Sequence, residues 1–285
     1  MAEPIIVATD GSEPAVRALE WAADEAARWE LPLHVVHVVE RWISTTPIMP
    51  PPDLADSFME NGRRILAEGE EIARSRRPGI EVTAELLSDP VVFALRQQSK
   101  RGFEMVLGHR GLGGFASMLL GSTGMRVAGH AAGPVVIVRG DDFAERGEVV
   151  VGIDLADVSE PAMEYAYRAA AVRGARLRVL HGWELPPALL QTGYGVDQAD
   201  VEESMRSGLV HAQEHWRGAH PGVEVVESTV RAHPVTALVE ASGEADLVVV
   251  GARGRTGLGA FRLGSVSHGV IHHSHVPVAV VRPRV

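Results

Sequence analysis

The stretch GHRG at residues 108–111 is followed by nine residues and then by GS at 121–122. The same pattern returns 143 residues further along the chain, as GARG at 251–254 and, after nine residues, GS at 264–265. Each copy begins directly after a short apolar run, and a stretch of helical character follows the second part. Two identical glycine spacings predict a duplicated chain with two equivalent sites.

The duplication covers nearly the whole chain. Asp10 and His37 have counterparts 144 residues later, at Asp154 and His181, whereas residues from the glycine pattern onward are offset by 143. The halves therefore differ by one residue between the second apolar run and the glycine pattern. The charged segment 140–147 is bounded by glycines and is the expected linker. We expect two domains, at residues 1–140 and 147–285.

Each half alternates apolar runs with amphipathic stretches. In the first half the expected strands are Ile5–Thr9, Leu33–Val39, Glu81–Leu87, Met105–Gly108 and Pro134–Arg139. In the second half they are Val149–Ile153, Leu177–Gly182, Glu224–Val230, Leu247–Gly251 and Val276–Val281. Several runs are continuously apolar, which is typical of strands that are buried on both faces. Helices between such strands predict an α/β fold of two tandem, doubly wound, five-stranded parallel sheets, each Rossmann-like.

Composition narrows the possible partners. The chain has 285 residues, 46% of them hydrophobic, and a formal net charge of −10, which disfavours nucleic acid and acidic membranes as partners. It contains no cysteine, so disulfides and thiolate metal sites are excluded. No apolar run reaches the roughly 18 residues of a membrane helix, and no basic region precedes Ile5–Ala8. We expect a cytoplasmic protein without a membrane association.

The glycine pattern predicts an anion site. Glycines at the end of a buried strand permit unusual backbone angles and a close approach of a ligand to the main chain. Residues 121–124 (GSTG) and 264–267 (GSVS) then open helices whose first amides carry the positive end of the dipole, with the serine hydroxyl as a further donor. The second copy adds a hydroxyl at Ser267. The alternative is a tight loop with the serine as helix N-cap.

Other phosphate-binding motifs fit less well. A Walker A loop requires Gly-Lys-Ser/Thr, but Lys100 is the only lysine. A dinucleotide fingerprint at 111–116 would follow the fourth strand instead of the first, and the second half lacks it.

Several further features have two interpretations. Asp10 and Asp154 end the first strand of each half, where a carboxylate accepts from a ribose hydroxyl or forms an Asx turn. Arg110 and Arg253 suit terminal phosphates or acidic residues across a dimer. The connections Trp42–Asp53 and Glu184–Asp197 are flaps over the sites or variable surface loops.

The order of these motifs resembles the universal stress protein family, in its tandem-domain, ATP-binding branch. The resemblance rests on VATDGS at 7–12, His37-Val38-Val39 and the Gly-x2-Gly-x9-Gly-Ser pattern, and it extends over residues 4–139 and 148–283. It implies an adenine-nucleotide alpha-hydrolase-like fold, ATP as cofactor with or without Mg²⁺, and a homodimer. It also implies that the apolar last strands pair the halves as an internal pseudo-dimer.

The resemblance also implies which residues contact the nucleotide. The adenine would lie against main chain at Ala8, Asp10 and Val38, and at Gly152, Asp154 and Gly182. Ribose and phosphates would lie along Gly108, Gly111, Gly121, Ser122, Thr123 and Gly124, and along Gly251, Gly254, Gly264, Ser265, Val266 and Ser267. Two departures predict unequal sites. Gly124 lacks the hydroxyl of Ser267, and the second half lacks the Asp-Gly-Ser turn.

No catalytic residue or metal ligand is predicted. His211 and His215 match a zinc-peptidase pattern, but His211 lies off the apolar stripe of its helix and no third ligand is evident. His268 and His272 form an i,i+4 pair. We expect a regulatory ATP-binding stress protein with one pocket per domain and little or no hydrolysis. The alternatives are an adenine-nucleotide enzyme, such as an adenylyl transferase or slow ATPase, and a dimerisation module with inactive pockets. The enzyme motifs are replaced by 10–13 (DGSE) and 154–156 (DLA). The preference among ATP, AMP and cyclic nucleotides, and the downstream partner, stay open.

Overall fold

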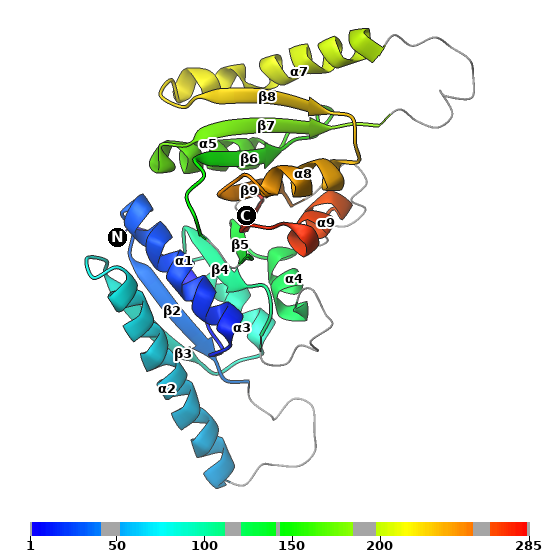
Figure 1. Cartoon of the computed structure of the whole chain (residues 1–285). Helices are drawn as coiled ribbons and strands as arrows, with labels where there is room; N and C mark the ends of the chain where they lie inside the picture. The colour runs from blue at the N-terminus through cyan, green and yellow to red at the C-terminus, as the bar shows by residue number, and fades with distance from the viewer. Residues whose placement is uncertain are drawn as a thin grey trace. The chain divides into compact units, whose positions relative to one another are not determined.

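The computed structural model describes residues 2–40, 52–111, 121–140, 143–184, 198–252 and 263–283 (Figure 1). The chain divides into two compact units, unit 1 at Met1–Arg139 and unit 2 at Gly140–Arg282. The segment expected as a linker, residues 140–147, belongs to unit 2.

Unit 1 is a five-stranded parallel sheet with helices between its strands. In chain order its elements are β1 Ile5–Ala8, α1 Glu13–Trp29, β2 Leu33–Val38, α2 Pro52–Arg76, β3 Val82–Leu87, α3 Val91–Gln98, β4 Glu104–Gly108, α4 Ser122–Ala128 and β5 Val135–Val138. The strand order is β3-β2-β1-β4-β5, and each neighbouring pair is parallel. This confirms the predicted doubly wound sheet.

Unit 2 repeats the arrangement. Its elements are β6 Glu148–Gly152, α5 Glu160–Arg173, β7 Arg176–Gly182, α7 Gln198–Ala219, β8 Val225–Val230, α8 Pro234–Ser242, β9 Leu247–Gly251, α9 Ser265–His273 and β10 Val278–Val281. The strand order is β10-β9-β6-β7-β8, again parallel throughout. The predicted elements are all present, with ends that differ by a few residues.

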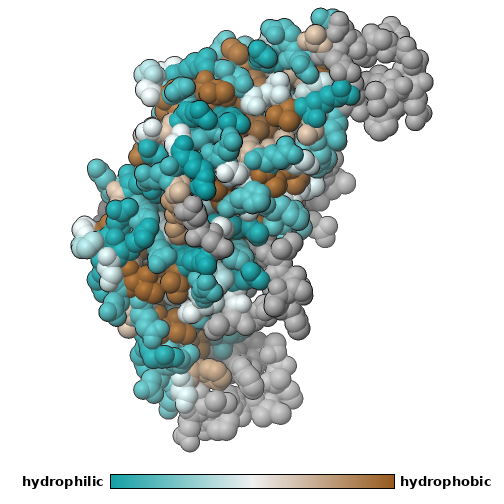
Figure 2. All heavy atoms as spheres, viewed as in Figure 1, coloured by the Kyte–Doolittle hydropathy of each residue, from teal (hydrophilic) through white to brown (hydrophobic). Residues whose placement is uncertain are grey.

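The central strands are buried on both faces, as their unbroken apolar runs predict. Ile5, Ile6 and Val7 of β1 are all fully buried, although successive side chains point to opposite faces of the sheet. Hydrophilic side chains cover much of the face that Figure 2 shows.

The strand order places the sites. β1 has β2 on one side and β4 on the other, so the connections that leave β1 and β4 run to opposite faces of the sheet. A crevice therefore opens beyond the carboxyl ends of these two strands, where open α/β sheets bind ligands. β6 and β9 hold the same position in unit 2.

Two other expectations, on membrane helices and on the two long connections, can be compared with the structure only over the described residues. Across the described ranges, no helix combines the length and the apolar character that crossing a bilayer requires. The connections 42–53 and 184–197, with their two interpretations as flaps or surface loops, lie almost wholly outside the described residues.

Candidate functional site

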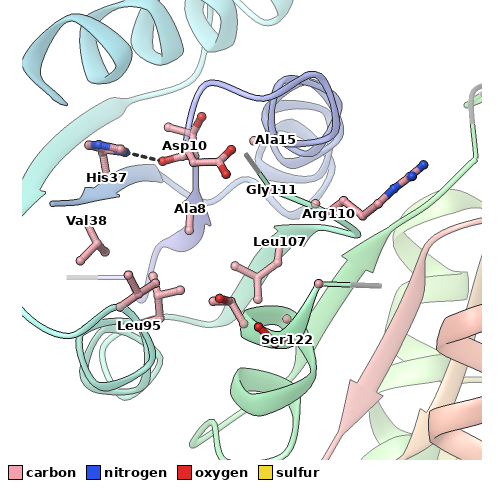
Figure 3. A pocket seen from close by; sticks show the side chains of 16 residues that line it. Ala8, Asp10, Ala15, His37, Val38, Leu95, Leu107, Arg110, Gly111 and Ser122 are labelled. Carbon is pink, nitrogen blue, oxygen red and sulfur yellow. Dashed lines mark hydrogen bonds between the residues drawn. The ribbon is translucent and has the colours of Figure 1, made fainter. Parts of the chain in front are cut away.

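A cavity of about 310 Å³ lies at the carboxyl ends of β1, β2 and β4 in unit 1 (Figure 3). All nine residues predicted for the first site line it: Ala8, Asp10, Val38, Gly108, Gly111, Gly121, Ser122, Thr123 and Gly124. The remaining wall is formed by Thr9, Ala15, His37, Val91, Leu95, Leu107 and Arg110. The volume is at the lower end of the range of small-molecule sites.

The turn after β1 is held by Asp10. Its Oδ1 accepts hydrogen bonds from the Ser12 amide at 3.1 Å and from Ser12 Oγ at 2.6 Å. Gly11 has a φ of +78°, a conformation that favours glycine. The Asx turn is therefore present, and the same carboxylate also lines the cavity. The two interpretations of Asp10 are compatible.

The glycines of the first copy have different packing roles. A β-carbon on Gly108 would lie 2.6 Å from the carbonyl oxygen of Pro14, because the first turn of α1 packs against this glycine. A β-carbon on Gly111 would overlap Asp10 Oδ2. At Gly121 the nearest atom would be 3.7 Å away, an ordinary contact. Gly108 and Gly111 thus make room for the protein's own atoms, and both also line the cavity.

The first turn of α4 lies at the cavity. The Gly121 amide donates to the His109 carbonyl at 2.9 Å, and Gly264 donates in the same way to Ala252 in unit 2. Gly121 and Gly264 are the N-caps, and neither helix has a side-chain cap bond, so the alternative of a serine N-cap is wrong. Ser122 is exposed and lines the cavity. The first-turn amides lack intrahelical acceptors and favour an anion there.

Arg110 lines the cavity and acts electrostatically on two neighbouring basic residues, His109 and Arg139. Burial lowers the pKa of His109, and the charges of Arg139 and Arg110 lower it further. Burial and the charge of Arg110 lower the pKa of Arg139 in turn. Figure 3 shows the Arg110 side chain directed away from Asp10. An anion in this part of the cavity would reduce the repulsion among these groups.

The sequence did not single out His37 as a site residue. His37 lines the cavity, and its Nδ1 lies 2.7 Å from the Thr9 carbonyl oxygen, so it donates across the ends of β1 and β2. His181 makes the equivalent contact to the Ile153 carbonyl at 3.0 Å in unit 2. The recurrence of this histidine at the repeat offset was the available signal.

The site in unit 2 lies only partly within the described residues. Gly254 and Arg253 lie outside the described residues, so their predicted roles are untested. Asp154 Oδ1 accepts from the Ala156 amide at 3.0 Å, which forms a turn without the Asp-Gly-Ser sequence.

Ser267 differs from the expectation. Its Oγ donates to the Gly251 carbonyl at 2.6 Å, and the residue is 3% exposed. The Ser267 hydroxyl proton is therefore engaged by the main chain and does not face a phosphate, so an inequality of the two sites does not follow from Gly124.

The histidine pairs do not assemble into larger groups. His211 is exposed and lies 3.5 Å from Glu214, and the rings of His268 and His272 are 4.6 Å apart. Within the described ranges no three His, Cys, Asp or Glu residues are placed to hold a metal ion. Asp10 is the only carboxylate in the wall of the unit-1 cavity as described, so a Mg²⁺ there would depend mainly on phosphate oxygens.

Comparison with known proteins gives one consistent result. The sequence profile of the Universal stress protein family matches residues 1–139 and 145–282. A universal stress protein of Mycolicibacterium smegmatis is 34% identical over 291 residues, covering 98% of this chain and 97% of the relative. One from Mycobacterium tuberculosis is 35% identical over 292 residues, covering 98% and 96%. The crystal structure of a universal stress protein from Archaeoglobus fulgidus, 23% identical, has a TM-score of 0.73 and covers 99% of this chain and 97% of that one.

Proposed function

Because the chain belongs to the universal stress protein family, we propose that it is a regulatory protein that binds ATP in the cavity of unit 1. Occupancy of this site would change the conformation or the partners of the protein. The observation that carries the proposal is the polarity of the cavity, which is apolar at one end and cationic at the other.

The apolar end suits a purine. Ala8, Val38, Val91 and Leu95 enclose a slot between the ends of β1 and β2 and the first turns of α3. Flat aromatic ligands are held by such apolar walls, while nearby main-chain groups give specificity. Here Ala8 and Val38 end their strands, so their backbone lies within reach of the base edge.

The middle and the far end suit a ribose and phosphates. Asp10 provides a carboxylate fixed by Ser12, and a ribose hydroxyl is a natural donor to its oxygens. Beyond it, Gly121–Gly124 present the start of α4, and the guanidinium of Arg110 in the cavity wall gives positive charge. The positive charge that would favour the phosphates is confined to this part of the cavity, because the chain as a whole carries a formal charge of −10.

We propose binding without fast hydrolysis. Among the described residues of the cavity wall, Asp10 is the only carboxylate, and its Oδ1 already accepts two hydrogen bonds. Activating a water requires a base free to accept a proton, and phosphoryl transfer also relies on lysine or Mg²⁺ ligands. We expect ATP turnover well below the roughly 1–100 s⁻¹ of kinases.

The test is mass spectrometry of the nucleotide released from purified protein, followed by calorimetric titration with ATP, AMP, cyclic AMP and GTP. Adenine nucleotides should bind, and GTP should bind more weakly. Phosphate release is measured in parallel, and rapid turnover would favour the enzyme alternative. The proposal is overturned if no nucleotide co-purifies and millimolar ATP does not bind.

A further inference from the structure

Unit 2 differs from unit 1 at the residues that correspond to the apolar end of the cavity. In unit 1 this end is formed by Ala8 and Val38 on the strands and by Val91 and Leu95 on α3. Their counterparts in unit 2 are Gly152, Gly182, Pro234 and Leu238. Two strand positions have therefore lost their side chains, and the space they leave is occupied.

Leu238 occupies the space above Gly152. A β-carbon on Gly152 would lie 2.7 Å from Leu238 Cδ1 and 3.0 Å from Cδ2. A side chain on Gly152 would force the terminal carbons of Leu238 to shift, so Leu238 lies closer to β6 than Leu95 can lie to β1, where the Ala8 methyl is present. Leu238 is 2% exposed, the same fraction as Leu95 in unit 1, so the two leucines differ in what they contact and not in their exposure.

The backbone of α8 occupies the space above Gly182. A β-carbon there would lie 2.8 Å from the Pro234 Cα and 3.2 Å from the Ala232 carbonyl oxygen. In unit 1 the Val38 side chain stands between the strand and α3, and it faces the cavity. In unit 2 strand and helix are in direct contact, and Gly182 is buried.

A third glycine, Gly269, allows α8 and α9 to pack closely, because it has no side chain between them. A β-carbon on Gly269 would lie 2.8 Å from both methyl carbons of Val235, whereas Arg126 holds this position in α4. Consistent with this, α8 packs closely along β6, β7 and β9, but α3 packs closely only against α4. Direct packing of α8 therefore takes up, in unit 2, positions at which side chains line the cavity in unit 1.

We propose that the chain binds one adenine nucleotide, in unit 1, and that α8 excludes the adenine base from unit 2. The inference rests on the function proposed for unit 1. It does not depend on residues 253–262, since Gly152, Gly182, Pro234 and Leu238 all lie within the described residues. Admitting a purine would require α8 to move away from Gly152 and Gly182 and would expose Leu238.

A matched pair of variants locates the nucleotide. Ser122 and Ser265 are equivalent, exposed first residues of α4 and α9, and neither makes a cap bond. An aspartate is favourable for the helix at this position, so Ser122→Asp and Ser265→Asp should both fold. Its negative charge repels phosphates bound nearby, and we expect a loss of about tenfold or more in ATP affinity at an occupied site.

The experiment is calorimetric titration of the full chain with ATP, with circular dichroism as the check on folding. We expect a stoichiometry of one nucleotide per chain, a large loss of affinity in Ser122→Asp and wild-type binding in Ser265→Asp. Two nucleotides per chain, or binding weakened by Ser265→Asp, would overturn the inference and leave the proposed function intact. If wild-type protein binds no ATP, the proposed function itself fails.

Discussion

The carboxylate of Asp10 lies directly against the α-carbon of Gly111, so close that a β-carbon on Gly111 would overlap Oδ2. The other oxygen, Oδ1, accepts from both the amide and the hydroxyl of Ser12. Because both oxygens are engaged, the carboxylate cannot turn away without a loss of contacts. The end of β1 and the loop after β4 are therefore joined through one side chain in the cavity wall.

This contact predicts how Gly111→Ala acts. The new methyl group must displace the Asp10 carboxylate, and overpacking of this kind costs about 1–3 kcal/mol of stability. The displaced carboxylate no longer meets the ribose, so we expect the Kd for ATP to rise about tenfold, which is about 1.4 kcal/mol. Titration calorimetry measures the binding, and urea denaturation measures the free energy of unfolding.

A double-mutant cycle separates this route from direct crowding of the ligand. If Gly111→Ala acts through Asp10, it should have little further effect on ATP affinity in an Asp10→Ala background. Additive losses would mean instead that the methyl group contacts the nucleotide.

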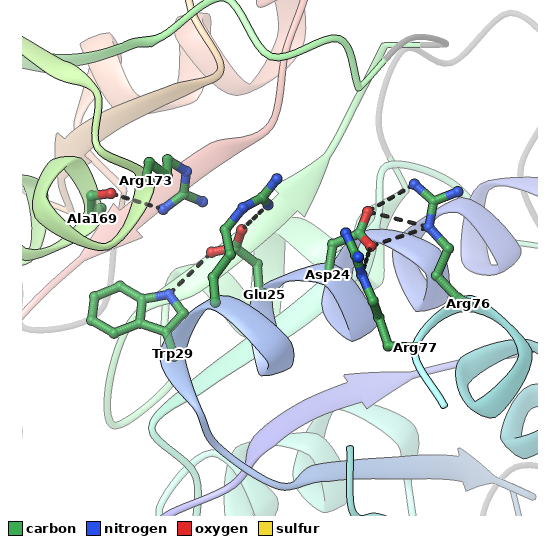
Figure 4. A network of polar contacts seen from close by, with 8 residues as sticks. Asp24, Glu25, Trp29, Arg76, Arg77, Ala169 and Arg173 are labelled. Atoms are coloured by element: carbon green, nitrogen blue, oxygen red, sulfur yellow. Dashed lines mark hydrogen bonds and ion pairs between the residues drawn. The ribbon is translucent and has the colours of Figure 1, made fainter. Parts of the chain in front are cut away.

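The pKa of Asp24 predicts a stability change at low pH. Burial raises this pKa, but hydrogen bonds from Arg76 and Arg77 outweigh burial, and the net shift is downward (Figure 4). The folded state therefore keeps the carboxylate charged to a lower pH than the unfolded state does. Its stabilisation is complete above the unfolded value, near 3.8, and is lost as the pH falls through the folded value.

Asp24→Asn should lower the free energy of unfolding by about 1–3 kcal/mol at pH 7, since hydrogen bonds to charged groups are worth about this much. The difference from wild type should shrink as the pH falls below 4. Urea denaturation across this range measures it. The control is Glu68→Gln in α2, which removes a 3.4 Å pair between exposed side chains and should cost at most about 0.5 kcal/mol. An equal loss in both variants would contradict the role of burial.

The environment of His109 predicts a second loss of stability as the pH falls, this time from a base whose pKa is lowered in the folded state. Burial and the charges of Arg139 and Arg110 lower its pKa in the folded state. As the pH falls through about 6.5, the unfolded chain takes up a proton that the folded chain does not. His109 therefore destabilises the fold progressively as the pH falls from about 6.5 to the folded pKa of His109. Above about pH 6.5 it has no such effect.

His109→Gln removes this titration and keeps a donor for the Val138 carbonyl, which lies 3.3 Å from Nδ1. We expect the loss of stability between pH 8 and pH 5.5 to be smaller in the variant than in wild type, by thermal or urea denaturation. His211→Gln, at a side chain that is 86% exposed, should leave the slope unchanged. Equal slopes in wild type and His109→Gln would show that burial does not affect this histidine.

The sequence predicted the topology because its signals are local and repeated. Continuous apolar runs such as 5–7 and 105–107 are typical of strands that are buried on both faces of a parallel sheet, and the glycine pattern marks the same loop in both halves. The nine residues predicted for the first site line one cavity for this reason. Topology alone brings the ends of β1, β2 and β4 to one edge.

The packing between elements was not predictable in the same way. The sequence shows that Gly152 replaces Ala8, but not that Leu238 lies over the vacated position. It shows a hydroxyl at Ser267, but not that the Gly251 carbonyl accepts its proton. Both outcomes depend on how closely a helix approaches the sheet, which is a property of many side chains together.

The contact between Gly182 and α8 predicts a difference in stability between two alanine variants of unit 2. In Gly182→Ala the new methyl group meets the Pro234 backbone at 2.8 Å, so all of α8 must shift, and we expect a loss of about 2–3 kcal/mol. In Gly152→Ala it meets only the terminal carbons of Leu238, which can rotate, and we expect about 1 kcal/mol. Neither glycine has a positive φ, so backbone strain does not contribute. Urea denaturation of both variants decides the matter: if Gly152→Ala is the more damaging, the side chain of Leu238 is held more rigidly than the backbone of α8.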